Sequence, residues 1–328
     1  MYSKKIDVAI IGCGYWGTNI IKTLKSLKVS KIYCYDNDIQ NLQKIKERFN
    51  EVLICKNLNE ILINKKIKIT FVCVPTYLIY KFAKILIRYQ KNVFLEKPVS
   101  IDKNKIYDLI RFAKNKKVRI MTGYIYIYNK YIKYIKDVIS KNKLGIIRYV
   151  ESNRKNFGPI RNDVSSLWDL ASHDLSIIKF IFSGNIKSPN HLKSEITKKK
   201  IFDIYSINFF IKKIKVNINV SWLYPEKVRQ ILVIGSKKIL MFDELNIKSP
   251  IKIFDVIKKY PLARDMPSKY FNPQKGISIK KPFIPKFKKF KPLEDELKFC
   301  LENILSKKKI FTDGKFSYLI AKDLAKFT

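Results

Sequence analysis

Short apolar runs alternate with longer segments of helical periodicity over the first 120 residues of the chain. The apolar runs are rich in β-branched residues, and in the longer segments apolar residues recur every three or four positions. This alternation is typical of a doubly wound parallel sheet covered by helices. It predicts strands near 6–11, 31–35, 52–54, 68–74, 92–95 and 118–122, and helices near 16–27, 38–48, 58–63, 77–89 and 102–115.

The rhythm changes after Gly123, where longer runs of alternating apolar and polar residues appear. Alternation with turn residues between the runs predicts a mostly antiparallel open sheet. We therefore expect a Rossmann-like α/β domain over residues 1–122 and an α+β domain over residues 123–328, packed around a cleft. An open sheet face favours self-association to a dimer or tetramer. The expected strands are 146–156, 201–211, 215–223 and 228–234. The expected helices are one that ends near 141 and three near 172–182, 293–305 and 314–326.

The most specific feature is a glycine-rich turn between the first strand and the first helix. Gly12, Gly14 and Gly17 follow the apolar run at 8–11 with the spacing G-x-G-x-x-G. The first glycine permits a tight turn, the second lets backbone approach a pyrophosphate, and the third lets the helix pack against the sheet. The helix N-terminus then faces the phosphates. The motif predicts a dinucleotide site, against the alternative of an ordinary strand-to-helix turn, and Tyr15 and Trp16 are candidates to shape and line it.

An acidic residue at the end of the second strand indicates which dinucleotide binds. Asp36 follows Gly17 by 19 residues. A carboxylate at this place accepts hydrogen bonds from a ribose 2′-hydroxyl and repels a 2′-phosphate. The sequence therefore favours NAD over NADP.

The chain has a formal net charge of +40, with 67 lysines and arginines against 27 acidic residues. Such an excess would ordinarily suggest a nucleic acid or an anionic membrane as partner. The basic residues are spread over every predicted helix, which favours compositional bias and leaves nucleic-acid binding as the weaker alternative. The densest basic segments, 198–200 and 281–292, are expected to be solvated loops or strand edges. A positive field would also attract an anionic substrate such as a nucleotide diphosphate sugar.

No segment has the roughly 18 uninterrupted apolar residues of a membrane span, and the N-terminal residues lead directly into the first strand. We therefore expect a cytoplasmic protein without membrane insertion. The five cysteines show neither C-x-x-C nor zinc-finger spacing. We expect neither structural disulfides nor a bound metal.

Three further motifs fall at the carboxyl ends of predicted strands, the edge where open α/β sheets bind ligands. They are Val74-Pro75-Thr76, Glu96-Lys97-Pro98 and Gly123-Tyr124, and a fourth motif, WDLASHDL, begins at Trp168. With the glycine loop, this order of motifs resembles the glucose-fructose oxidoreductase/inositol dehydrogenase/rhizopine catabolism (Gfo/Idh/MocA) family over essentially the whole chain. The resemblance implies an NAD-dependent oxidoreductase, with further cofactor contacts expected from Val74, Pro75, Thr76, Glu96 and Lys97.

Within this family the sequence is most similar to a branch found in surface-polysaccharide biosynthesis. The shared features are a G-Y-W-G loop at residues 14–17, the pair Tyr128-Asn129, and an L-W-D-L-A-x-H-D motif at residues 167–174. Related enzymes oxidise the C3 hydroxyl of UDP-N-acetylglucosamine-type sugars. The resemblance therefore implies a sugar substrate of the UDP-N-acetylhexosamine type and leaves the individual sugar open.

Lys97, Asp169 and His173 are the candidate catalytic residues. An ammonium group at a strand end can hydrogen-bond the reacting alcohol and shuttle its proton, and the family places its catalytic lysine at the position of Lys97. His173 follows Asp169 by four residues, so we expect both side chains on one helical face, with Asp169 orienting the other two groups. A neutral imidazole can remove the hydroxyl proton. The same spacing suits two metal ligands, but no further cluster completes a metal shell.

Substrate contacts are expected mainly from the second domain. Arginine forks bind phosphate or carboxylate at two points, so Arg154 and Arg161 are candidates to orient a charged sugar, and ordinary salt bridges are the alternative. The complete set of candidate substrate-binding residues is Tyr124, Asn129, Arg154, Asn156, Arg161, Trp168, Asp169 and His173.

Two positions depart from the family pattern. Ile79 stands where many relatives have a histidine, which bears on the detailed cofactor contacts, and Gln90 stands where many have a glycine, which affects only a helix cap. Two other activities fit the same fold. One is an NAD-dependent glycosidase or lyase in which oxidation is transient, and the other is a non-catalytic NAD-binding regulator. Net NADH formation distinguishes the first from a dehydrogenase, and an inert Lys97→Ala change would indicate the second.

Overall fold

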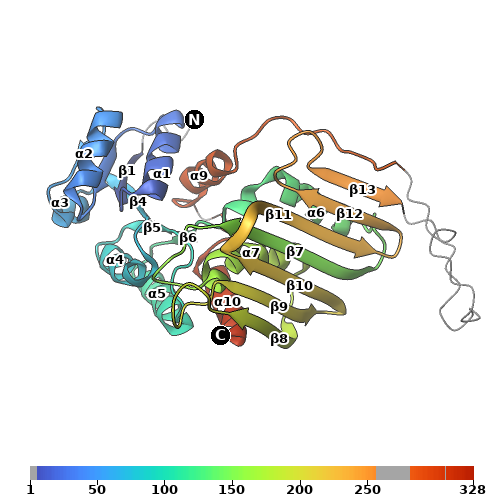
Figure 1. Cartoon of the computed structure of the whole chain (residues 1–328). Helices are drawn as coiled ribbons and strands as arrows, with labels where there is room; N and C mark the ends of the chain where they lie inside the picture. The colour runs from blue at the N-terminus through green and yellow to red at the C-terminus, as the bar shows by residue number, and fades with distance from the viewer. Residues whose placement is uncertain (1–5, 256–280, 307) are drawn as a thin grey trace, which may run out of the picture.

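The first sheet is parallel throughout, as the sequence predicts. The computed structural model describes residues 6–255, 281–306 and 308–328. The strand order in this sheet is β3-β2-β1-β4-β5-β6, with strands β1 (Asp7–Ile11), β2 (Ile32–Tyr35), β3 (Leu53–Ile54), β4 (Ile67–Val72), β5 (Asn92–Leu95) and β6 (Ile120–Thr122). Five helices connect them (Figure 1): α1 (Tyr15–Ser26), α2 (Ile39–Arg48), α3 (Leu58–Ile63), α4 (Thr76–Arg88) and α5 (Lys103–Asn115).

Local sequence explains why these elements form where they do. Strand β1 is buried at all five positions, which accounts for its unbroken apolar sequence. Helices α2 and α5 begin after Asp38 and Asp102, whose side chains accept hydrogen bonds from the backbone N–H groups of Gln40 and Asn104. Such caps satisfy amides that the first turn of a helix leaves unpaired. The predicted elements of this sheet are confirmed, with boundaries within two residues.

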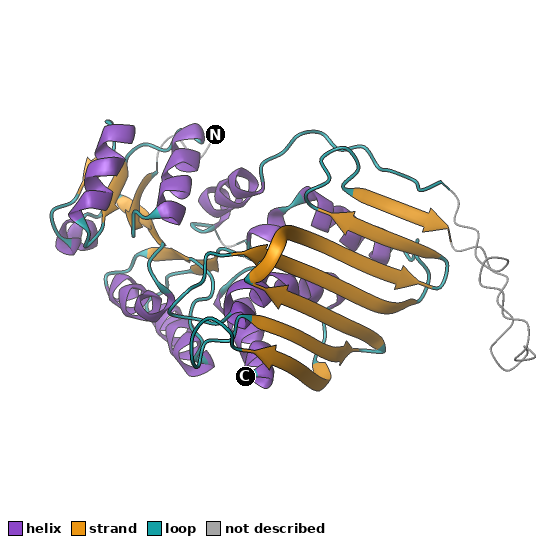
Figure 2. Cartoon of the chain, viewed as in Figure 1, coloured by secondary structure: helices purple, strands orange, loops and turns teal. Residues whose placement is uncertain are grey.

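The second sheet has seven strands in the order β13-β12-β11-β7-β10-β9-β8. It is mixed and mostly antiparallel, because β7 and β10 run parallel while the other recorded pairs are antiparallel. Figure 2 shows helices behind this sheet, leaving its near side open in the part of the chain that is described. The strands are β7 (Ile147–Phe157), β8 (Ile186–Ser194), β9 (Ile204–Ile211), β10 (Ile214–Ser221), β11 (Leu223–Gly235), β12 (Lys238–Asp243) and β13 (Ile251–Asp255), and the helices are α6 (Lys130–Ser140), α7 (Ser172–Phe182), α9 (Pro292–Asn303) and α10 (Gly314–Leu324).

The edge strands β8 and β13, and β12 next to β13, are not predicted from the sequence. In β8 only Ile186 is buried, and the rest of the strand reads KSPNHLKS. An edge strand with one buried side chain shows no apolar alternation. β8 therefore gives no strand signal in the sequence, whereas β12 and β13 are short strands that do have buried residues.

The chain crosses from the first sheet to the second after β6, at the place of the proposed division between residues 122 and 123. The C-terminal segment nevertheless returns to the first sheet. The backbone N–H of Thr122 donates to the carbonyl of Thr312 at 2.8 Å, and its hydroxyl lies 2.7 Å from that of Ser317 in α10. One continuous cluster of buried apolar residues includes members of both sheets. The two parts are therefore joined by a packed interface.

The two densest basic segments are exposed to solvent. The lysines at 198–200 lie in an exposed turn before β9, and residues 281–291 are mostly extended coil with exposed lysines. All five cysteines are free thiols. Within the described ranges, no helix is both long enough and apolar enough to cross a membrane.

Candidate active site

The glycine loop between β1 and α1 has the close packing that its sequence predicts. Gly12 has a φ of +92°, and a Cβ there would lie 2.6 Å from the carbonyl oxygen of Cys73. A Cβ on Gly17 would lie 2.0 Å from the carbonyl oxygen of Gly12, whereas the Cβ position of Gly14 has no atom within 4 Å. Gly12 and Gly17 therefore cannot be replaced by a larger residue, and the open space at Gly14 leaves room for a ligand beside the backbone.

Asp36, at the end of β2, is attached to this loop. One carboxylate oxygen accepts a hydrogen bond from the N–H of Cys13 at 2.6 Å, and the other accepts one from the N–H of Asp38 at 2.9 Å. Gly14 is the N-cap residue of α1 and provides no side-chain cap, so the first-turn amides remain available to an anion. These residues fit a dinucleotide whose pyrophosphate lies at α1 and whose ribose lies near Asp36.

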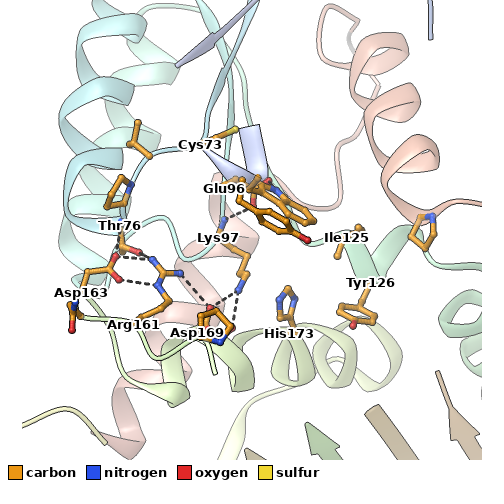
Figure 3. A pocket seen from close by; sticks show the side chains of 18 of the residues that line it. Cys73, Thr76, Glu96, Lys97, Ile125, Tyr126, Arg161, Asp163, Asp169 and His173 are labelled. Atoms are coloured by element: carbon orange, nitrogen blue, oxygen red, sulfur yellow. Dashed lines mark hydrogen bonds and ion pairs between the residues drawn. The ribbon is translucent and has the colours of Figure 1, made fainter. Parts of the chain in front are cut away.

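A cavity of about 750 Å³ opens at the carboxyl ends of β4, β5 and β6, between the two parts of the chain (Figure 3). Most of the predicted motifs contribute to it, together with residues that sequence reasoning did not select. The lining consists of Tyr15, Trp16, Cys73, Val74, Pro75, Thr76, Glu96, Lys97, Gly123, Ile125, Tyr126, Asn129, Pro159, Arg161, Asn162, Asp163, Asp169, His173, Glu244 and Pro292.

Lys97 is held in this cavity by Asp169. Its ammonium donates to the carbonyl oxygen of Asp169 at 2.8 Å and to the carboxylate oxygen Oδ1 at 3.2 Å. The two side chains are 12% and 17% exposed, and the other carboxylate oxygen accepts a hydrogen bond from the indole N–H of Trp222 at 3.1 Å. Burial opposes ionisation of Asp169, but the positive charges of Lys97 and Arg161 prevail and lower its pKa. Asp169 therefore carries the negative charge that fixes the lysine.

His173, in α7, lies beside Lys97 in the cavity wall (Figure 3). Its ring meets that of Tyr126 edge-on, with 5.2 Å between centroids, and its Nδ1 is buried without a hydrogen-bond partner among the described residues. Burial, followed by the positive charges of Lys97, Arg154 and Arg229, lowers its pKa well below 6.5. The imidazole is therefore neutral at neutral pH and can accept a proton.

Asp169 and His173 both line the cavity, as their four-residue spacing predicts. Residues Leu167–Ala171 form a turn of π-helix before α7 begins. The hydrogen bonds of the Asp169 carboxylate go to Lys97, Arg161 and Trp222. The expectation that Asp169 orients both groups is corrected: among the described contacts it holds Lys97 and not His173.

Glu96 is a buried carboxyl group in the same wall. It is 9% exposed and accepts a hydrogen bond from the indole N–H of Trp16. Burial raises its pKa to about 7, although Trp16 and Lys97 act in the opposite direction. A Cβ on Gly123 would lie 2.9 Å from a Glu96 carboxyl oxygen. The glycine loop, the Glu96-Lys97-Pro98 motif and the Gly123-Tyr124 motif therefore meet around the Glu96 carboxyl group.

Arg161 joins the second part of the chain to the cofactor side of the cavity. Its guanidinium donates to both oxygens of Asp163, at 2.9 and 2.7 Å, and to Asp169 at 3.3 Å. It also donates to the hydroxyl of Thr76 at 3.2 Å, and Asp163 accepts the N–H of Thr76 at 3.0 Å. The loop after β4 is thus tied to the segment that precedes α7.

The expectation that Arg154 contacts a charged sugar is corrected by its surroundings. Its side chain is 5% exposed, and it pairs with Asp174 through two hydrogen bonds of 2.8 and 3.1 Å. The guanidinium also donates a third hydrogen bond, to the hydroxyl of Tyr126 at 2.7 Å. A buried guanidinium requires such partners. Arg154 therefore lies in the core behind the cavity lining and supports the lining residue Tyr126.

Three other expected substrate residues also lie outside the cavity lining. Tyr124 and Trp168 are 2% and 6% exposed and belong to the core, while the amide of Asn156 is bonded to the carbonyl of Gly158. Their motifs mark packing around the site and not its surface. The expected substrate residues that do line the cavity are Asn129, Arg161, Asp169 and His173.

Tyr126, Trp222 and Glu244 take part in the site, and sequence reasoning missed them. Tyr126 lies in a Tyr/Ile-rich stretch that is typical of a core, and Glu244 follows β12, a strand that the sequence does not predict. Trp222 directly follows the alternating run of β10, and a tryptophan at a strand end was the one available signal. Only the tertiary fold brings Tyr126 and Glu244 to the cavity lining and Trp222 behind it, where it bonds to Asp169.

The positive excess of the chain does not extend to the cavity lining. Four carboxyl groups line it, against two basic side chains and His173. Both basic side chains, Lys97 and Arg161, are already paired with carboxylates. The described lining thus offers no free cation for a phosphate. Nor does any group of three His, Cys, Asp or Glu side chains in the described ranges come together to hold a metal.

Comparison with known proteins assigns the part of the chain that forms the first sheet. Residues 6–124 match the model of the Gfo/Idh/MocA oxidoreductase family, described as an NAD-binding Rossmann fold. The matched region includes the glycine loop, Asp36 and the loops after β4 and β5, and the rest of the chain lies outside it.

Solved structures share the fold of the whole chain. A putative oxidoreductase from Magnetospirillum magnetotacticum has a TM-score of 0.81 at 17% identity, covering 98% of this chain and 99% of that one. UDP-N-acetylglucosamine 3-dehydrogenase GnnA from Acidithiobacillus ferrooxidans has a TM-score of 0.79 at 15% identity, covering 98% and 96%. GenD2 from gentamicin A biosynthesis, solved with NAD, has a TM-score of 0.80 at 15% identity, covering 100% and 94%. At these identities the likeness concerns the fold.

Curated relatives are equally distant in sequence. An uncharacterized oxidoreductase of Synechocystis sp. is 22% identical over 193 residues, which are 55% of this chain and 52% of that protein. The 2,7-anhydro-N-acetylneuraminate hydratase of Mediterraneibacter gnavus is 22% identical over 192 residues, covering 55% and 50%. The chain thus spans about half the length of these two relatives.

Proposed function

We propose that this protein is an NAD-dependent oxidoreductase that oxidises a secondary hydroxyl group of a sugar. The observation that carries the proposal is the presence of a fixed ammonium, Lys97, and a neutral buried imidazole, His173, in one cavity at the carboxyl edge of the first sheet. One group can hydrogen-bond an alcohol oxygen and the other can accept its proton.

The residues divide the chemistry between them. NAD, when bound at the glycine loop, supplies the acceptor for the hydride. Lys97 directs its ammonium at the alcohol oxygen and stabilises negative charge there, because Asp169 keeps it in place. His173 is neutral and takes the hydroxyl proton. Asp36 would bind the adenosine ribose and select NAD over NADP.

The substrate that we propose is a nucleotide-linked amino sugar of the UDP-N-acetylhexosamine type, oxidised at C3. Similarity of the motifs to the polysaccharide branch and the fold shared with GnnA support this choice. The pairing of Arg161 with two carboxylates limits how the substrate binds. The diphosphate would have to lie outside the described lining, with only the sugar ring between Lys97 and His173.

A second candidate is chemistry without net oxidation, such as hydration or elimination through a transient ketone. The 22% identity to a 2,7-anhydro-N-acetylneuraminate hydratase favours it. The two candidates share Lys97 and His173 and differ in the fate of the hydride. A dehydrogenase accumulates NADH, and an enzyme with transient oxidation returns the hydride to the product.

The test is turnover with NAD and a panel containing UDP-N-acetylglucosamine, N-acetylglucosamine and glucosamine. Lys97→Met and His173→Ala should retain NAD affinity and lose roughly 10²-fold or more in turnover. Lys44→Met, an exposed lysine of α2, and His191→Ala, outside the cavity, are matched controls that should behave like the parent. Parental turnover in either site variant would remove that residue from the mechanism.

Two further expectations remain proposals. The first is a cytoplasmic location. The second is self-association through the exposed face of the second sheet, where Phe210 and Met241 are 41% and 47% exposed. Apolar side chains on an open sheet face favour such contacts.

A further inference from the structure

Glu244 is a cavity carboxyl group to which the proposed mechanism gives no role. It follows β12 in a loop, is half-buried and lines the cavity. Its backbone N–H donates to the carbonyl of Arg229 in β11 at 3.0 Å. The loop is therefore fixed to the second sheet, and the side chain has a defined position.

The hydrogen bonds around Glu244 have only one consistent direction. Arg154 donates to the hydroxyl oxygen of Tyr126 at 2.7 Å, and a guanidinium has no acceptor. The proton of the Tyr126 hydroxyl must then point elsewhere, and Glu244 Oε2 lies 2.8 Å away. Asp174, which pairs with Arg154, completes the chain behind the wall. Glu244 Oε2 is therefore an acceptor held by a buried network.

The second oxygen of Glu244 has no hydrogen bond to any described residue. A carboxylate oxygen is an acceptor, so it favours a hydroxyl or ammonium group as neighbour and disfavours phosphate or carboxylate. One side chain, that of Tyr126, separates Glu244 from His173. The Tyr126 ring packs against His173 with 5.2 Å between ring centroids, and the Tyr126 hydroxyl donates to Glu244. A sugar ring has donor groups on carbons next to the reacting one, which suits this arrangement.

We propose that Glu244 determines specificity by accepting a hydrogen bond from a hydroxyl or ammonium group of the sugar, next to the hydroxyl that is oxidised. The inference rests on the proposed function, since it takes the reacting hydroxyl to lie at Lys97 and His173. Tyr126 is the positioning residue that holds the carboxylate. The class of substrate is thus one with a donor at this position, and any anionic group of the substrate points away from Glu244.

The test compares Glu244→Gln, Tyr126→Phe and the control Glu226→Gln, an exposed glutamate of β11. Kinetics are measured with NAD and with UDP-N-acetylglucosamine, N-acetylglucosamine and glucosamine. In Glu244→Gln the amide oxygen can still accept from Tyr126, and its NH₂ group replaces the free acceptor. A lost hydrogen bond to a charged acceptor predicts that KM for the sugar rises about tenfold or more. NAD affinity should stay unchanged, and kcat should change less than KM.

The outcomes separate this inference from the function on which it rests. Tyr126→Phe should raise KM less than Glu244→Gln, because the carboxylate remains, and Glu226→Gln should match the parent. If the parent turns over a sugar and Glu244→Gln has the parental KM, the inference is overturned and the proposed function stands. If the parent neither binds nor oxidises any sugar of the panel, the proposed function fails and the inference fails with it.

Discussion

Replacing Glu96 by glutamine should change how the stability of the protein depends on pH. The Glu96 carboxyl is 9% exposed, and burial raises its pKa to about 7 from 4.5. The folded state therefore binds a proton more tightly than the unfolded state does. Where the folded pKa of an acid is raised, stability falls as pH rises from the unfolded pKa through the folded one, and the loss is complete above the folded pKa.

The size of the effect follows from the two pKa values. A difference of 7 minus 4.5, or about 2.5 units, at about 1.4 kcal/mol per unit corresponds to about 3 kcal/mol between the extremes. Glutamine has nearly the same shape, can accept the hydrogen bond from Trp16, and does not ionise. The Glu96→Gln variant should therefore gain about 3 kcal/mol relative to the parent as pH rises from below 5 to 8.

The assay is urea unfolding of both proteins at pH 5, 6, 7 and 8. Glu302→Gln, on an exposed position of α9, controls for the loss of one acidic residue. Burial and the charge of Glu96 raise the pKa of Glu296 as well. Because Glu96→Gln removes that charge, Glu296 ionises more easily in the variant, which changes the stability difference in the same direction. A difference between parent and variant that stays constant over this pH range would refute the reasoning.

Four further outcomes are expected. The pKa of His173 lies well below 6.5, so kcat/KM should not decline around pH 6.5 on the acid side, and a decline centred there would contradict a neutral base. Asp174→Asn leaves the buried Arg154 without its carboxylate and should cost about 3–5 kcal/mol in urea unfolding. Calorimetry should show NAD at least about tenfold, or about 1.4 kcal/mol, tighter than NADP, and equal affinities would mean that Asp36 does not face the ribose. In gel shifts, duplex DNA should bind weakly and dissociate by about 0.2 M salt, and sequence-preferring binding above it would revive the nucleic-acid alternative.

The first sheet and its glycine loop could be predicted because local constraints and periodicity agree there. Gly12 and Gly17 are required by contacts of 2.6 and 2.0 Å that a Cβ would make with backbone carbonyls, and such requirements leave a sequence motif. The family departures are explained in the same local terms. Gln90 adopts the positive φ of +56° that a glycine would take after α4, and Ile79 is 1% exposed in the core.

The environment of the charged residues could not be predicted from the sequence. The sequence does not distinguish an arginine that contacts a substrate from one that contacts a buried partner. Only the folded structure shows that Arg154 in β7 pairs with Asp174 in α7. Helical spacing predicts Asp169 and His173 on one face, and both line the cavity, but the spacing does not reveal which residues the Asp169 carboxylate bonds to. Glu244 is a single acidic residue after β12, a short strand with weak alternation, so nothing in the local sequence marks it.

The most direct test of the account is a structure of the protein with NAD bound. The account predicts the pyrophosphate at the N-terminus of α1 and the nicotinamide ring inside the cavity. One face of C4 should be open toward Lys97 and His173, with room for a sugar carbon at the reacting distance of about 3–3.5 Å. A nicotinamide ring outside the cavity, or one whose open face turns away from Lys97 and His173, would contradict the central claim.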